Sequence, residues 1–328
     1  MRRREFIAFL GSVAIAAPRK AIAQTSAKVY HLAVVSSGGP VAESSPNAKI
    51  LLGALTERGY TLGQNLAFEF PRGATEQAAR LPQFMGELKA SKVDVIVAYG
   101  YPTALAAKMA GIPTVVAFGV GDPVATGLVE SLSRPGGTIT GISDVATMLT
   151  TKRMGLLKEL VPNLRRVAML WNKDDLGMSQ RYAASAKAAE SMGVTVQPLG
   201  VREPDDFNEA FTVMDREPPD ALLMVSDSLT RLNRKRVFEY ATAHRLPAIY
   251  EYDPLVRDGG LMSYGPDLRE SLERAASMVD RIFKGAKPAD LPFEQPTRYL
   301  FVINLKTAKS IGLEIPATLL ALADEVIE

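Results

Sequence analysis

Cysteine is absent from this chain of 328 residues, and histidine occurs only at His31 and His244. Disulfide bonds, thiolate catalysis, cysteine-ligated zinc and lipid attachment at an N-terminal cysteine are therefore excluded. Two histidines are too few for a histidine-rich metal site, so the sequence predicts no metal. Positive and negative residues nearly balance, with Lys+Arg 38 and Asp+Glu 36, which gives no indication of a nucleic-acid partner.

Motifs for common catalytic and cofactor sites are also missing. Gly119 and Gly121 follow the fourth expected strand and not the first, and Val124 replaces the third glycine of a dinucleotide fingerprint. The Walker lysine motif is absent. The segment 260–265 has the wrong spacing for a nucleophile elbow. The sequence therefore predicts no cofactor and no enzymatic activity, although a catalytic pair of carboxylates leaves no such motif.

The first two dozen residues have the pattern of an export signal. Arg2, Arg3 and Arg4 form a basic start, an apolar run of eleven residues covers 7–17, and 21–23 (Ala-Ile-Ala) fits a small-x-small cleavage site. The apolar run is shorter than the roughly 20 residues of a membrane span. The run 3–7 (Arg-Arg-Glu-Phe-Ile) resembles a twin-arginine signal. We expect cleavage near Ala23 and a periplasmic location, by either the twin-arginine or the general secretory route.

The mature chain would be slightly acidic. Loss of residues 1–23 removes five positive charges and one negative charge, so the net charge falls from +2 to −2. A cysteine-free, slightly acidic protein outside the inner membrane has few common roles, among them solute capture and hydrolysis.

Strand and helix patterns alternate twice along the chain, which is 47% hydrophobic and long enough for two domains. The first half predicts strands at 29–36, 66–71, 94–98 and 113–118 and helices at 47–58, 74–90 and 103–109. The second half predicts strands at 166–171, 194–199, 220–225, 248–250 and 260–264 and helices at 178–192, 204–216 and 233–244. Such alternation is typical of parallel sheets with helices on both faces, so we expect two doubly wound α/β lobes.

Ligands of open parallel sheets bind beyond the carboxyl ends of the strands, so the residues after each strand are the candidate site. They are small, polar or aromatic, and several precede helices whose N–H groups favour a carboxylate. The candidates are Ser36, Ser37, Tyr99, Gly100, Tyr101, Asp122, Trp171, Asn172, Ser226, Asp227, Tyr250, Glu251 and Tyr264.

The candidates have alternative structural roles. Asp122 and Asp227 carry carboxylates that can pair with a ligand ammonium, but each is equally placed to cap a helix. Asn172 can donate to a ligand carboxylate. Trp171 is either a stacking wall or a core residue, and two or three of the tyrosines are expected at the site. Ser36 and Ser37 are hydrogen-bond candidates that also suit a turn, and Glu251 suits the pocket or the hinge.

Motifs along the second half, in order and spacing, resemble the ABC-transporter substrate-binding family related to the tryptophan-binding TrpX proteins. They lie at 119–124, 134–137, 156–162, 261–267, 284–292, 303–309 and 323–327, and the resemblance extends over the mature chain. It implies a type I periplasmic binding fold with three crossovers between lobes. It further implies that 24–145 with about 266–290 form lobe 1, and that 146–265 with about 291–328 form lobe 2.

The resemblance also implies a function: capture of a small molecule by lobe closure and delivery to an inner-membrane ABC permease with its ATPase. Members bind aromatic or other amino acids, and a monomer is the usual state of this class. Tyr101 departs from the Thr or Ser that many members have before the proline at 102, which puts the ligand in question. Two alternatives remain open, an aromatic carboxylate as the ligand and a membrane sensor as the partner.

Overall fold

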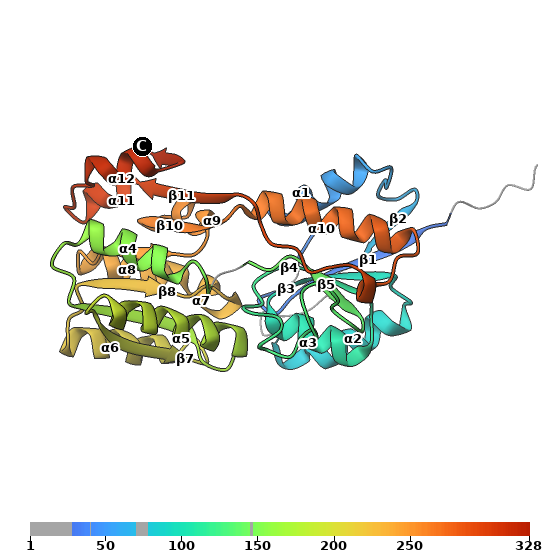
Figure 1. Ribbon diagram of the computed structural model, residues 1–328, viewed down its shortest axis with the longest axis horizontal. Coiled ribbons are helices and arrows are strands. Elements are labelled where there is room, and N and C mark those ends of the chain that lie inside the picture. Colours follow the sequence, from blue (N-terminus) through green and yellow to red (C-terminus); the bar gives the residue numbers. More distant parts are fainter. Residues whose placement is uncertain (1–27, 40, 70–77, 145–146) are drawn as a thin grey trace, which may run out of the picture.

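The computed structural model describes residues 28–39, 41–69, 78–144 and 147–328. The predicted export signal therefore lies outside the described residues, as does the start of the helix expected at 74–90. The described chain forms two α/β lobes that lie side by side and are joined by extended segments (Figure 1). No helix in these ranges combines the length and apolarity needed to cross a membrane.

The first lobe is built on a parallel sheet with the strand order β2-β1-β3-β4-β5. Its strands are β1 (Tyr30–Ser36), β2 (Leu66–Glu69), β3 (Val95–Tyr99), β4 (Thr114–Phe118) and β5 (Ile139–Gly141). Its helices are α1 (Pro46–Thr56), α2 (Leu81–Ala90), α3 (Tyr101–Ala110) and α10 (Leu268–Phe283), with 3-10 turns η1 (Ala78–Arg80) and η2 (Pro288–Asp290). Every residue of β3 and β4 is buried, as expected for central strands covered on both faces.

The second lobe is built on a larger sheet with the order β12-β11-β10-β9-β8-β6-β7. Its strands are β6 (Arg166–Asn172), β7 (Thr195–Val201), β8 (Ala221–Met224), β9 (Ala248–Tyr250), β10 (Met262–Pro266), β11 (Tyr299–Asn304) and β12 (Glu325–Ile327). Its helices are α4 (Thr150–Leu160), α5 (Leu176–Ser191), α6 (Asp206–Arg216), α7 (Ser228–Leu232), α8 (Arg234–Ala243), α9 (Asp253–Arg257), α11 (Leu305–Ser310) and α12 (Ala317–Leu322).

The prediction of two α/β lobes with parallel sheets is confirmed, with one correction in the second sheet. Strand β11 runs antiparallel to β10, so this sheet is mixed. The reason is the path of the chain: after β10 it crosses to the first lobe, and β11 returns in the opposite direction along β10 (Figure 1). The alternation of strand and helix along the sequence carries no sign of that reversal.

Helix α10 belongs to the first lobe although it follows β10 of the second. Asp267 caps its N-terminus by accepting a hydrogen bond from Arg269 N at 2.8 Å. Apolar residues at spacings of three and four, including Leu272, Ala276 and Val279, are buried in the core beneath α1. The helix thereby ties a late part of the sequence to the first lobe.

Three connections join the lobes, and neighbouring ones are hydrogen-bonded to each other. Ser143 N after β5 donates to Glu294 O at 2.8 Å, and Glu294 N donates to Gly141 O at 2.9 Å. Asp267 N, before α10, donates to Arg298 O at 3.0 Å. The carboxyl ends of the central strands of both sheets therefore meet near these connections, and that junction is where the site is sought.

Candidate functional site

A cavity of about 30 Å³ lies where the two lobes meet. The first lobe contributes Ser36, Ser37, Tyr99, Gly100, Phe118 and Gly119, and the second contributes Asp175, Ser226, Asp227, Ser228, Arg231 and Tyr252. We call this space the inner chamber. It has room for about two water molecules, since each needs about 10–15 Å³ by the same measure.

A larger interlobe cleft of about 470 Å³, which we call the outer chamber, adjoins the inner one. The two chambers share Ser36, Tyr99, Ser228 and Arg231. The rest of the outer chamber is lined by Gly38, Gly39, Val41, Ser45, Pro46, Asn47, Leu232, Arg234, Pro254, Leu255 and Asp258. A third space of about 590 Å³ lies beside β7 and α6 of the second lobe alone, so lobe closure would not enclose a ligand there.

The lobes touch across the cleft. Ser37 Oγ donates to Ser228 Oγ at 2.9 Å, which joins the end of β1 to the start of α7. At a second contact a Cβ on Gly177 would lie 2.9 Å from Val120 O, closer than real Cβ atoms approach. Glycine at 177 therefore lets the two backbones meet, and the structure is a closed form of the two lobes.

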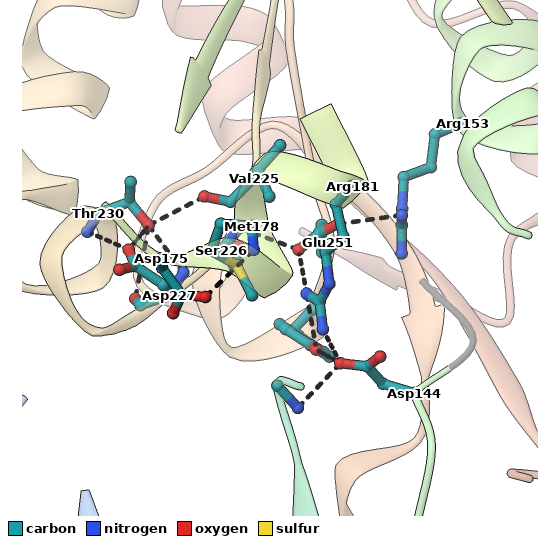
Figure 2. A network of polar contacts seen from close by, with 12 residues as sticks. Asp144, Arg153, Asp175, Met178, Arg181, Val225, Ser226, Asp227, Thr230 and Glu251 are labelled. Atoms are coloured by element: carbon teal, nitrogen blue, oxygen red, sulfur yellow. Dashed lines mark hydrogen bonds and ion pairs between the residues drawn. The ribbon is translucent and has the colours of Figure 1, made fainter. Parts of the chain in front are cut away.

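A buried network of four charged side chains holds the junction together (Figure 2). Arg181 of α5 donates to Asp144, in the first connection between the lobes, and to Glu251 Oε2 at 2.9 Å. Arg153 of α4 donates to Glu251 Oε1 at 3.1 Å and to Tyr264 O at 2.7 Å. All four side chains are at most 2% exposed, and their formal charges cancel.

The network also reaches the first lobe and the inner chamber. Asp144 Oδ2 accepts hydrogen bonds from Gly119 N and from the Tyr252 hydroxyl, both at 2.8 Å. Glu251 Oε2 accepts a further bond from Ser226 N at 2.9 Å. The network therefore fixes three residues that line the inner chamber, Gly119, Ser226 and Tyr252.

Asp175 is a further buried carboxylate, and it lines the inner chamber. It is 2% exposed and caps α5 by accepting a hydrogen bond from Met178 N at 3.2 Å. Burial, and then the nearby negative charge of Asp227, raise its pKa to about 7, and backbone donation from Met178 and Gly177 offsets part of this. Its charge is therefore incompletely compensated by the protein.

Asp227 lies beside it with most of its hydrogen-bonding capacity used. Its Oδ1 accepts from Thr230 N at 2.8 Å and so caps α7, and its Oδ2 accepts from Asn172 Nδ2 at 2.6 Å. Figure 2 shows Asp175 and Asp227 side by side, separated from the Arg181 network.

Two residues that line the inner chamber, Tyr99 and Ser226, carry buried hydroxyl groups with no hydrogen-bond partner among the described residues. Their side chains are only 6% and 2% exposed. Burial raises the pKa of the Tyr99 phenol, so this group is a neutral donor. An unsatisfied buried polar group costs about 1–3 kcal/mol, which a ligand that hydrogen-bonds to it would recover.

Arg231 lines both chambers. Within the described ranges no carboxylate lies at ion-pair distance from its guanidinium, and burial lowers its pKa. The neighbouring Arg234, in contrast, donates to Asp258 at 2.6 Å. Arg231 therefore presents a positive charge to the cleft that the protein leaves available.

The structure brings about half of the sequence candidates together. Ser36, Ser37, Tyr99, Gly100, Ser226 and Asp227 line the inner chamber. Asn172 is not part of this lining, but its side-chain amide donates to Asp227 and so orients it.

The other candidates lie outside the inner chamber, each for a structural reason. Asp122 is exposed and accepts from Val124 N and Ala125 N, so it caps a turn and not the helix that its alternative role predicted. Tyr101 packs in a first-lobe core, and Tyr250 in a second-lobe core. Trp171 stacks on Tyr182 with the ring centroids 3.6 Å apart, and Tyr264 packs beside Tyr299. Glu251 is held in the buried network.

Sequence reasoning missed Asp144, Asp175, Arg181 and Arg231. Asp175 follows the β6 strand by only three residues, so a search extended to the cap of the next helix would have found it. Arg231 lies in α7, just after the Ser226-Asp227-Ser228 loop. Asp144 and Arg181 carry no local signal, because they are 37 residues apart and meet only in the fold.

Two α/β lobes with parallel-dominant sheets, three connections and a cavity at their junction define a type I periplasmic binding protein. Residues 46–327 match the family model described as "ABC transporter substrate binding protein". The chain belongs to this family. Its members are extracytoplasmic solute-binding proteins that work with ABC permeases, and they are not enzymes.

Similar proteins include amino-acid binders. A tyrosine-binding protein of Clostridioides difficile (strain R20291) is 25% identical over 263 residues, 80% of this chain and 75% of the relative. An ABC domain from Streptococcus pneumonia in complex with L-Trp matches with a TM-score of 0.81 and 25% identity, over 92% of this chain and all of that one. A conserved domain protein from Vibrio cholerae matches with a TM-score of 0.83 and 25% identity, over 91% of this chain and all of that one.

Replacement of Arg181 by leucine tests the buried network. The substitution leaves Asp144 and Glu251 without their shared cation in a dry interior, and we expect it to lower the free energy of unfolding by about 3–5 kcal/mol. Urea denaturation measures the change. Arg202→Leu is the matched control, because Arg202 forms an exposed ion pair with Asp174 and should cost less than about 1 kcal/mol. Similar losses in both variants would contradict the role assigned to the network.

Replacement of Asp175 by asparagine tests whether ionisation of this carboxyl destabilises the ligand-free protein. Its folded pKa, about 7, exceeds the ordinary 3.8, so the penalty for ionising it grows between pH 4 and pH 7 and is constant above. Asparagine keeps the cap acceptor without the charge. We expect the variant to be more stable than wild type by about 2 kcal/mol or more at pH 8, since each pKa unit corresponds to about 1.4 kcal/mol. Denaturation from pH 4 to pH 8 measures the difference, and an advantage that does not grow with pH would refute the assignment.

Proposed function

We propose that this chain is the exported solute-binding component of an ABC transporter. It captures an α-amino acid, with an aromatic one as the leading candidate, by closing its lobes, and it delivers the ligand to the permease. One observation carries the proposal: Tyr99 and Ser226, one from each lobe, line a shared chamber and carry buried hydroxyls without partners among the described residues. A ligand that satisfies both stabilises the closed form over the open one, as a population shift requires.

The walls of the chambers suit a ligand with an aromatic part. Tyr99 and Phe118 stack with ring centroids 4.6 Å apart, and Tyr252 lies 6.3 Å from Phe118. Tyr99 also lines the outer chamber, and a ring of this kind favours offset stacking with another ring. The relatives described as tyrosine-binding and as a complex with L-Trp support an aromatic amino acid.

Export, partner and oligomeric state are part of the proposal. The sequence pattern at 1–23 supports cleavage near Ala23 and a periplasmic location. The family supports a permease with its ATPase as the partner. The proposed working form is a monomer.

An aromatic carboxylate is a second candidate ligand. The unpaired guanidinium of Arg231 favours it, because that group binds any carboxylate, with or without an amine. A membrane sensor in place of the permease would leave the capture step unchanged.

A thermal-shift screen of residues 24–328 tests capture. The panel holds the twenty amino acids, aromatic carboxylates, short peptides, sugars and nucleosides. A ligand at 100 times its dissociation constant adds about 2.7 kcal/mol of stability, which raises the melting temperature visibly. We expect an amino acid to produce the shift. A shift by amine-free acids alone would favour the second candidate, and no shift with any solute would refute capture.

Replacement of Gly177 by alanine tests closure. The added Cβ meets Val120 O only when the lobes are closed, so we expect a roughly tenfold loss of affinity, equivalent to about 1.4 kcal/mol. Alanine favours a helix, so the open protein should keep its stability. Titration calorimetry measures the affinity. The control is Gly155→Ala in α4, where the new Cβ meets no atom within 4 Å. Equal affinities in the two variants would show that ligand binding does not form the contact at Gly177.

A further inference from the structure

The charges at the cleft are unevenly divided between the lobes. The first lobe lines the inner chamber with serines, glycines and the rings of Tyr99 and Phe118, none of them charged. The charged groups of this chamber are Asp175, Asp227 and Arg231, all from the second lobe. A zwitterionic ligand therefore finds both of its counter-charges on one lobe.

We propose that Asp175 binds the ammonium group and Arg231 the carboxylate of an α-amino acid, which lies with its charged end in the inner chamber and its side chain in the outer one. The inference rests on the capture proposed above and deepens it, because it assigns both charged ends and the direction of the ligand.

The ammonium end is assigned by charge and by remaining hydrogen-bonding capacity. Asp227 Oδ1 and Oδ2 already accept from Thr230 and Asn172, whereas Asp175 accepts only backbone bonds at the start of α5. Two carboxylates close together in a buried chamber disfavour each other's ionised form, and a cation beside them relieves that cost. The unpartnered Ser226 hydroxyl in the same chamber supplies a further acceptor for the ammonium.

The carboxylate end is assigned by position as well as by charge. Arg231 belongs to the lining of both chambers, so it lies where they adjoin. Tyr99, whose buried hydroxyl has no partner among the described residues, lines the same two spaces and can donate to the same carboxylate. In an α-amino acid the carboxylate and ammonium share one carbon, so a ligand held by Arg231 reaches the deeper Asp175 with its amine.

The side chain then extends outward, because the inner chamber, at about 30 Å³, has no room for it. The outer chamber measures about 470 Å³ and is partly apolar, with Val41, Leu232 and Leu255 in its lining. The charged groups thus select the amino-acid head, and the outer chamber selects among side chains.

Ligand analogues that lack one charge test the assignment. L-tyrosine and L-tryptophan are each compared with their amide, which lacks the carboxylate, and their desamino acid, which lacks the ammonium. Wild-type protein should bind the amino acid at least tenfold more tightly than either analogue, because each lost charge-assisted hydrogen bond is worth about 1.5–3 kcal/mol. Asp175→Asn should reduce only the difference in affinity between the amino acid and the desamino acid. Arg231→Gln should reduce only the difference in affinity between the amino acid and the amide.

Proton release supplies a second measurement. An ammonium beside Asp175 stabilises its ionised form, so binding near pH 7 should release a fraction of a proton from a carboxyl whose pKa is about 7. Asp227 and Tyr101 are the other titratable groups that act on Asp175, and Arg231 is the remaining charge in the chamber. Calorimetry in two buffers of different ionisation enthalpy measures the release, which should be lost in Asp175→Asn.

Matched controls are Asp174→Asn, an exposed neighbour of Asp175, and Arg236→Gln, whose guanidinium contacts Pro204 and Asn208 outside the cleft. Both control variants should keep the wild-type ratios of affinity for the amino acid and its two analogues. The assignment is overturned if either test variant weakens all three ligands equally or leaves the ratios unchanged, or if Asp175→Asn still releases the proton. If wild-type protein binds other solutes but neither amino acid, the assignment falls and capture stands. If it binds no solute, capture falls as well.

Discussion

The closed junction depends on the pairing of Arg181 with Asp144 and Glu251. Two carboxylates and two guanidinium groups with almost no solvent contact are tolerable only because each charge has an opposite partner. Asp144 stands in a connection between lobes, and its other contacts come from Gly119 of the first lobe and Tyr252 of the second. The pairing thus sets where strand ends from both lobes lie, and with them Ser226 and Tyr252 in the chamber wall.

Much of the fold could be predicted from the sequence because the relevant signals are local. The apolar run of β3 and the turn at the end of α5 are readable within ten residues, and strand–helix alternation implies parallel sheets. The mixed second sheet was not readable. Its antiparallel strand β11 results from a crossing to the other lobe. A local sequence pattern carries no information on the path that the chain takes between the lobes.

The candidate site, like the fold, could be predicted from the sequence only in part. The rule that ligands bind at the carboxyl ends of parallel strands led to Ser36, Tyr99 and Asp227. It identifies the end of a strand but not the direction of each side chain, and so it also selected Tyr250, which points into a core. Glu251 carries a charge whose partners lie 70 and 98 residues away, and only the assembled lobe shows that they neutralise it.

The hydrogen bonds between the three connections have a mechanical consequence. Strands joined edge to edge, as at Ser143 with Glu294 and Asp267 with Arg298, form a narrow ribbon. A ribbon bends easily across its flat face but resists shear between its strands and bending within its plane, because those motions stretch the cross-links. The lobes should therefore open and close about essentially one axis, like a door on a strap hinge, so that the same pairs of residues meet at every closure.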